Sequence, residues 1–126
     1  MERFPQISDG EWDVMKVVWK QPGCSASHVI ETLAGKRHWG PATVKTLLNR
    51  LTKKGALSFE KEENFYRYTA TFSEDAMRRT ETQNFIDRVF DGAFTPFLAN
   101  FVKGRRLSAE EIAELEALLR EGRKGK

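Results

Sequence analysis

The sequence predicts a mainly α-helical protein with one small β-hairpin, and three observations carry this prediction. Apolar residues recur at helical spacing in six separate stretches, and most of these stretches begin with a residue that caps helices. Only residues 57–72 alternate aromatic and β-branched side chains around a polar turn, as paired strands do. With 40% hydrophobic and 31% charged residues, the 126-residue chain has an ordinary globular composition.

Two short helices are expected at the start of the chain. The run Ser8-Asp9-Gly10-Glu11 is a capping box, in which a hydroxyl and a glutamate three residues later satisfy free backbone groups at a helix start. Pro22 and Gly23 end this helix, because neither continues it. Ser25 caps the second helix, whose apolar residues keep the i, i+3, i+4, i+7 spacing until Gly35 ends it.

A third helix is expected over residues 41–55, with one apolar and one polar face. Pro41 suits its first turn, and Lys53-Lys54-Gly55 closes it. The apolar stripe consists of Val44, Leu47, Leu48 and Leu51. The opposite face carries Thr43, Lys45, Thr46, Asn49, Arg50 and Lys53.

A β-hairpin follows the third helix. Its expected strands flank the turn Lys61-Glu62-Glu63-Asn64. Three short helices and a hairpin make a winged helix-turn-helix, which exposes the polar face of its third helix to a DNA major groove. There Thr and Asn read base edges, while Lys and Arg contact guanine or phosphate. The six residues of that polar face are therefore the predicted DNA-binding residues, joined by Arg67 of the hairpin, although glutamates crowd its turn.

The placement of charge favours DNA over a merely solvated polar face. The net charge of the chain is +3. Residues 36–72 hold eight Lys and Arg against three Glu, whereas residues 1–35 carry a net −2 and residues 73–126 are balanced. The basic excess thus coincides with the hairpin and with the third helix, residues 41–55, which is the predicted DNA-reading helix.

The second part of the chain, residues 73–126, predicts three further helices with much apolar surface. Five of the nine phenylalanines fall between positions 85 and 101. Helices of this size bury too little surface to be stable alone, so we predict a winged-helix DNA-binding domain over 1–72 and a helical dimerisation region over 73–126 of a homodimer. The alternative is a monomer in which these helices pack on their own N-terminal part. The predicted dimerisation residues are Phe85, Val89, Phe90, Phe94, Phe97, Leu98, Phe101, Ile112, Leu115 and Leu119.

Other classes of protein find little support. The single cysteine, Cys24, cannot form an internal disulfide, and the chain has neither a signal-peptide pattern nor a membrane-span pattern, so a cytoplasmic location is expected. No nucleophile motif, acid–base pair or glycine-rich phosphate loop indicates an enzyme, and no cofactor is expected. Cys24 and His28 share an i, i+4 spacing, but two ligands do not make a tetrahedral metal site.

Six segments together resemble the BlaI/MecI penicillinase-repressor family, which also contains CopY-type copper repressors. They are ISDGEWDVMKVVW, WGPATVKTLLNRLTKKGAL, FYRYTA, FIDRVFDGAF, LANFVKG and LSAEEIAEL, in order over nearly the whole chain. The resemblance implies a dimeric repressor on a palindromic operator, with Thr43, Lys45, Thr46 and Arg50 at operator-contacting positions. Ala42 stands where relatives often have lysine, which puts one phosphate contact in question.

The resemblance also implies a switch. Penicillinase-type relatives are inactivated when a signalling protease cuts an Asn-Phe bond in the dimerisation region, and Asn100-Phe101 falls at that place. The alternative is that Phe101 is only a core residue and Asn100 only an exposed one. Two other functions stay open: a winged helix that binds protein, and a metal-responsive repressor without a proteolytic switch, although the C-terminal EALLREGRKGK lacks the cysteines of copper-type relatives.

Overall fold

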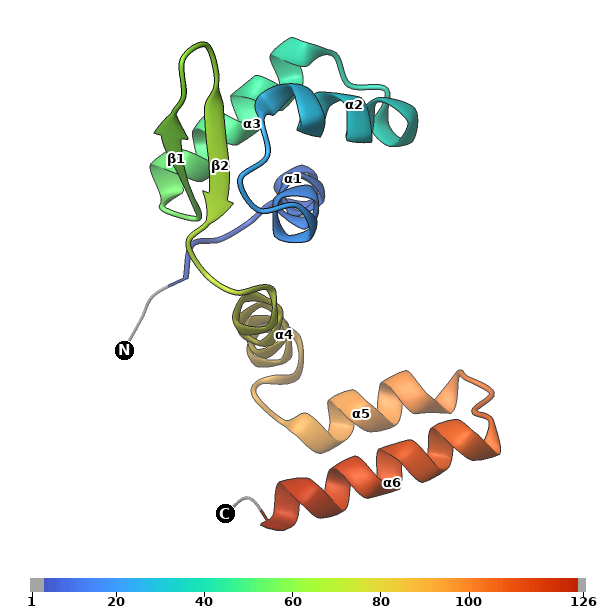
Figure 1. The fold of residues 1–126 in the computed structure, drawn as a ribbon. Coiled ribbons are helices and arrows are strands. Elements are labelled where there is room, and N and C mark those ends of the chain that lie inside the picture. The colour runs from blue at the N-terminus through green and yellow to red at the C-terminus, as the bar shows by residue number, and fades with distance from the viewer. Residues whose placement is uncertain (1–3, 125–126) are drawn as a thin grey trace. The chain divides into compact units, whose positions relative to one another are not determined.

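The computed structural model describes residues 4–124, which form six α-helices and one two-stranded antiparallel sheet (Figure 1). The elements are α1 (Asp9–Lys20), α2 (Ala26–Arg37), α3 (Pro41–Lys54), β1 (Leu57–Lys61), β2 (Tyr66–Ala70), α4 (Glu74–Phe90), α5 (Phe94–Lys103) and α6 (Ala109–Lys124). The mainly α-helical class with one hairpin is confirmed. None of the described helices is long and apolar enough to span a bilayer.

The chain forms two compact units, Met1–Thr82 and Gln83–Lys126. The boundary between these units lies within α4. The division of function at residues 72 and 73, drawn from the charge distribution, stays a prediction.

The start of α1 has the predicted capping box. The Ser8 backbone N–H donates to Glu11 Oε1 at 2.9 Å, and the Glu11 backbone N–H donates to Ser8 Oγ at 3.2 Å. The same arrangement, between Ser108 and Glu111, opens α6. Both helix starts follow from the local sequence because each capping group lies within one turn of its partner.

The core of the first unit is formed by one face of each of α1, α2 and α3. Its largest fully buried side chains are Met15, Leu48, Leu51, Glu11, Val14, Val18, Val29 and Val44. Trp12 and Trp19 are only partly buried at the edge of this core, and the Trp19 indole N–H donates to the carbonyl of Phe72 at 2.9 Å. This bond joins α1 to the segment that follows the hairpin.

The second helix is longer than the sequence indicated. The spacing predicts an end near Gly35, but α2 continues to Arg37 and ends at His38, whose φ is 58°. A glycine costs a helix interior only about 1 kcal/mol relative to alanine, so it does not have to end the helix. The left-handed His38, whose backbone N–H donates to Ala34 O at 3.2 Å, supplies the end instead.

The hairpin is tied to the helices through the loop between α1 and α2. Tyr68 of β2 is buried, and its backbone exchanges two hydrogen bonds of 2.8 Å with this loop, one with Gly23 N–H and one with Cys24 O. Within the hairpin, Phe59 pairs with Tyr68 and Glu60 with Arg67. The loop therefore acts as a short third strand beside β2.

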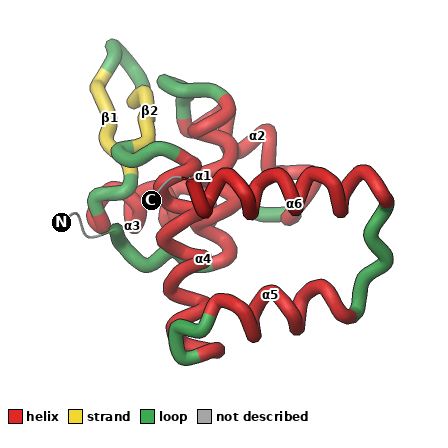
Figure 2. Tube along the Cα trace, turned by 90° about the horizontal axis from the view of Figure 1, so that it is seen from below, coloured by secondary structure: helices red, strands yellow, loops and turns green. Residues whose placement is uncertain are grey.

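The second unit has few buried side chains. A cluster of phenylalanines surrounds Phe97, whose ring centroid lies 5.7 Å from that of Phe90 and 6.3 Å from that of Phe101. The helices α5 and α6 are joined by the loop of residues 104–108, drawn in green in Figure 2. Among the described residues of this unit, Ile86 is the only one that is buried, at 4% exposed.

Candidate nucleic-acid interface

The polar face of α3 is free to meet a ligand, and its apolar face is not. Val44 and Leu51 are completely buried, and Leu48 is 1% exposed. All six polar residues predicted to bind DNA are exposed: Thr43, Lys45, Thr46, Asn49, Arg50 and Lys53. The structure thus gathers these side chains on one helix surface, at the spacing expected from the sequence.

The N-terminus of α3 offers free backbone donors. Gly40 precedes the helix and makes no side-chain cap, while Pro41 occupies the first turn. The Thr43 side chain lies in this first turn, where a phosphate can accept from backbone N–H groups and benefit from the helix dipole. The Thr46 hydroxyl already donates to the carbonyl of Ala42 at 3.0 Å, so toward a ligand it acts as an acceptor.

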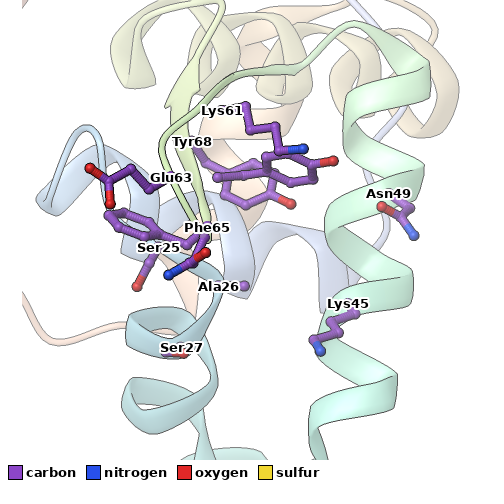
Figure 3. Close-up of a pocket in the computed structure, with 11 residues that line it drawn as sticks. Ser25, Ala26, Ser27, Lys45, Asn49, Lys61, Glu63, Phe65 and Tyr68 are labelled. Carbon is purple, nitrogen blue, oxygen red and sulfur yellow. The ribbon is translucent and has the colours of Figure 1, made fainter.

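A groove of about 560 Å³ lies between α3, the hairpin and the start of α2. In Figure 3, Lys45 and Asn49 project from α3, while Lys61 and Tyr68 of the hairpin lie across from them and Ser25 lies at the start of α2. A surface lined by ammonium groups, hydroxyls and an amide suits a sugar-phosphate backbone. The groove therefore brings the reading helix and the hairpin to a single surface.

Several groove residues were not among the predicted DNA-binding residues. Ser25 was predicted only as a helix cap, and its hydroxyl does accept from the backbone N–H of His28 at 3.2 Å. Ser27, Lys61 and Tyr66 join it along the groove. These residues reach the groove through packing between distant segments, which the sequence does not show directly. Lys61 is the exception, because a lysine in a polar turn next to a basic helix is itself a sign of nucleic-acid binding.

Ion pairs inside the fold decide which cations remain available. Lys54 pairs with Glu11 at 2.6 Å, while Arg37 and Lys36 both pair with Asp13. These three cations neutralise carboxylates of α1. Among the described residues, the cations of the basic segment 36–72 that make no ion pair are Lys45, Arg50, Lys53 and Lys61. All four belong to α3 or to the hairpin.

Arg67 has partners within the protein. Its Nε donates to Glu62 Oε1 at 2.9 Å, and its Nη1 donates to the carbonyl of Gly23 at 3.1 Å. The guanidinium also lies over the ring of Phe65, with 5.3 Å between Cζ and the ring centroid. Arg67 is thus less available to a ligand than the four unpaired cations.

Three groups near these elements have shifted pKa values. Burial disfavours the charged form of Glu11, but its contacts with Lys54 and Ser8 outweigh burial, so the pKa of this carboxyl lies below its ordinary 4.5. Burial raises the pKa of the Cys24 thiol and, with a smaller contribution from Tyr66, that of the Tyr68 hydroxyl. Both groups therefore stay neutral near pH 7, and Cys24 has no thiolate character.

The predicted dimerisation residues form an exposed apolar surface on the second unit. Phe94 is 53% exposed, Phe101 52% and Leu119 56%. Phe85, Val89, Ile112 and Leu115 are also exposed, while Phe90, Phe97 and Leu98 are partly buried. So much exposed apolar surface on three helices is typical of a protein–protein contact.

Asn100 and Phe101, the predicted cleavage residues, both lie within α5 and are exposed. The Arg105 guanidinium covers the Phe101 ring, with 4.3 Å between Cζ and the ring centroid. The peptide bond between the two residues is therefore helical, whereas a protease needs an extended segment.

Metal ligands do not gather in the described part of the chain: no group of three or more His, Cys, Asp or Glu there could hold an ion. Cys24 is buried and its backbone pairs with Tyr68. Cys24 therefore serves as a small core side chain beside the hairpin.

Comparisons with known proteins agree with this geometry. The profile of the penicillinase repressor family matches residues 7–121. The penicillinase repressor of Bacillus licheniformis is 39% identical over 96% of this chain and 94% of its own. The methicillin resistance regulatory protein MecI of Mammaliicoccus sciuri is 36% identical over 90% of this chain and 93% of its own. A solution structure of monomeric Bacillus licheniformis BlaI with the blaP half-operator is 44% identical, with a TM-score of 0.53 over 60% of this chain and 92% of that one.

Family membership also settles the class of activity, because penicillinase repressors regulate transcription by binding DNA and catalyse no reaction. The chain belongs to the penicillinase repressor family and is a DNA-binding transcriptional repressor.

Proposed function

We propose that this protein acts in the cytoplasm as a homodimer, with its two winged-helix heads on the two halves of a palindromic operator. The observation that carries the proposal is the exposed polar face of α3, with Lys45, Arg50 and Lys53 free of ion pairs in the described residues. The half-operator in complex with monomeric BlaI supports one head per half-site.

The exposed apolar surface of α4, α5 and α6 supports the dimer. Its phenylalanines and leucines would be covered by the same surface of a second copy, as in isologous two-fold dimers. Coupling two heads in this way raises the affinity for a palindrome far above that of one head, because the second head binds at a high effective concentration. Two recognition helices would then meet half-sites about 34 Å apart, or a multiple of that distance.

Cleavage between Asn100 and Phe101 by a signalling protease is the proposed switch. The cut would separate Phe101 from Phe97, with which its ring is stacked, and disconnect α6 from the rest of the chain. Loss of the apolar surface that joins two copies would lower the affinity for the operator through loss of the dimer.

The test is binding of the purified protein to the DNA upstream of its own gene and to a scrambled duplex, at two salt concentrations, with the mass in solution measured alongside. We expect a dimer that prefers the upstream DNA and weakens steeply as salt rises. A monomer, or equal and weak binding to both duplexes, would contradict the proposal and direct attention to another locus or to a protein partner.

A further inference from the structure

The hairpin carries its only arginine in a fixed position. Arg67 bonds to Glu62 of the turn at 2.9 Å and to the Gly23 carbonyl of the α1–α2 loop at 3.1 Å, and it lies over Phe65. Its side chain is 50% exposed and that of Glu62 is 49% exposed. An ion pair this open to water is weak by itself, but the carbonyl and the ring hold the same guanidinium on two further sides.

The turn of the hairpin adjoins the reading surface. Glu63, Asn64 and Phe65 line the groove that Lys45 and Asn49 of α3 also line. Glu62 and Arg67 do not line this groove; they line a separate hollow of the same turn, together with Glu63, Asn64 and Phe65. DNA on the polar face of α3 that extends over the turn would come within reach of this hollow. A free arginine there would bind phosphate without regard to sequence, whereas a glutamate repels phosphate.

We propose that Glu62 is a specificity-determining residue. It holds Arg67 against the Gly23 carbonyl and so keeps the guanidinium from DNA phosphates. The hairpin then contributes little sequence-independent affinity, and discrimination depends on the side chains of α3. This inference rests on the proposed operator binding, and it concerns the ratio between specific and non-specific affinity.

The number of phosphate contacts sets both the non-specific affinity for DNA and its dependence on salt. Each phosphate contact strengthens binding to every sequence and makes it more sensitive to salt. An arginine that already satisfies a carboxylate and a carbonyl would have to give up both bonds to gain one phosphate. Removing the carboxylate changes this balance, since the guanidinium then gains more from DNA than it loses from Gly23.

The experiment uses the full chain with Glu62→Gln, measured on the upstream palindrome and on a scrambled duplex over a series of salt concentrations. Binding to the scrambled duplex should tighten about threefold to tenfold at low salt, and its salt slope should steepen by about one per head. The preference for the palindrome should fall correspondingly. A purely structural role of Glu62 would not steepen the salt slope.

Glu60→Gln is the matched control. Glu60 lies directly opposite Arg67 in the strand register, so the substitution removes the same charge from the same hairpin. Among the described residues Glu60 makes no ion pair, so Arg67 stays held and the salt slope should not change. An equal effect of both substitutions would mean that overall charge acts, and the proposed hold on Arg67 would be wrong.

Two further variants test whether Arg67 causes the effect of Glu62→Gln. Glu62→Gln combined with Arg67→Gln should return the scrambled-duplex affinity and slope to those of the unmodified protein. If Arg67→Gln alone weakened palindrome binding tenfold without lowering the melting temperature, Arg67 would be a DNA contact and the inference would fail. Failure of the unmodified protein to prefer its palindrome would instead count against the proposed function.

Discussion

Glu11 and Lys54 form an ion pair of 2.6 Å between the first turn of α1 and the last residue of α3. The Glu11 side chain is only 1% exposed, whereas that of Lys54 is 36% exposed. Lys54 also donates to the carbonyl of Gln6 at 2.8 Å. The C-terminal end of α3 is thus fixed to the N-terminal end of α1, and Lys54, one of the eight cations counted in the basic segment 36–72, is neutralised by this contact.

Glu11→Ala should lower the free energy of unfolding by about 2–3 kcal/mol, because it removes both the ion pair and half of the capping box. Glu11→Gln is the matched variant, since an amide oxygen still accepts from the Ser8 backbone N–H. Its loss should be smaller, about 1–2 kcal/mol. Urea unfolding at neutral pH measures both values. Equal losses would show that the capping hydrogen bond contributes nothing, and an unchanged Glu11→Gln protein would show that the charge contributes nothing.

Stability should also fall in acid because of Glu11. Its pKa in the folded protein lies below the ordinary 4.5, so the ion pair contributes stability above pH 4.5 that is lost as pH falls through the folded pKa. Unfolding free energies measured from about pH 7 down to pH 3 should therefore fall less steeply for Glu11→Gln than for the unmodified protein. Parallel curves would rule out this carboxyl as a source of acid sensitivity.

Arg50→Ala should weaken binding to the upstream palindrome by roughly tenfold to a hundredfold, which is the usual cost of losing one arginine contact to a base. The melting temperature and the mass in solution should not change, because Arg50 is exposed and makes no ion pair in the described residues. As a control, Arg78→Ala removes another exposed arginine, which pairs with Glu74 and lies outside the polar face of α3. If the two variants lost similar affinity for the palindrome, Arg50 would not be a base-contacting residue.

Local signals in the sequence were enough for most of the fold. The capping boxes at Ser8 and Ser108 and the Leu stripe of α3 each depend on neighbours within a turn or two, so their pattern can be read directly. The predicted end of α2, at Gly35, was too early because the helix in fact ends at His38, which adopts a left-handed conformation. A left-handed residue other than glycine has no strong signature in the sequence.

The candidate site was less predictable for a different reason. The polar face of α3 was evident from the helical period, but the sequence did not show which lysines and arginines form ion pairs within the protein. Lys54 and Arg67 are engaged by Glu11 and Glu62, and the former contact joins residues 43 positions apart. Which cations remain free therefore depends on tertiary packing, while the counted charge of the segment does not change.

Phe97→Asp should dissociate the proposed dimer. Phe97 lies at the centre of the phenylalanine cluster, within 6.3 Å of the ring of Phe101, and a carboxylate there would be buried without a partner in any dimer that covers this surface. Thr95→Asp places the same charge on an exposed position of α5 as a control. Sedimentation over a concentration range would measure the change in mass, and a dimeric Phe97→Asp protein would exclude this cluster from the interface.

Cleavage between Asn100 and Phe101 should be slow in the folded helix and should require its last turn to open. The bond lies within the helix Phe94–Lys103, and a protease binds an extended chain, so the helix has to open locally before it is cut. Val102→Gly lowers helix propensity next to the bond, so a broad-specificity protease at low concentration should cut this region several-fold faster.

The conservative partner Val102→Ala, which keeps the helix, is the control. Val102 is partly buried, so each variant loses apolar contact and only the backbone effect differs between them. The cut protein should then elute as a monomer and lose the palindrome at concentrations where the intact dimer still binds. A nicked protein that stayed dimeric and bound would remove the proposed switch while leaving operator recognition by α3 in place.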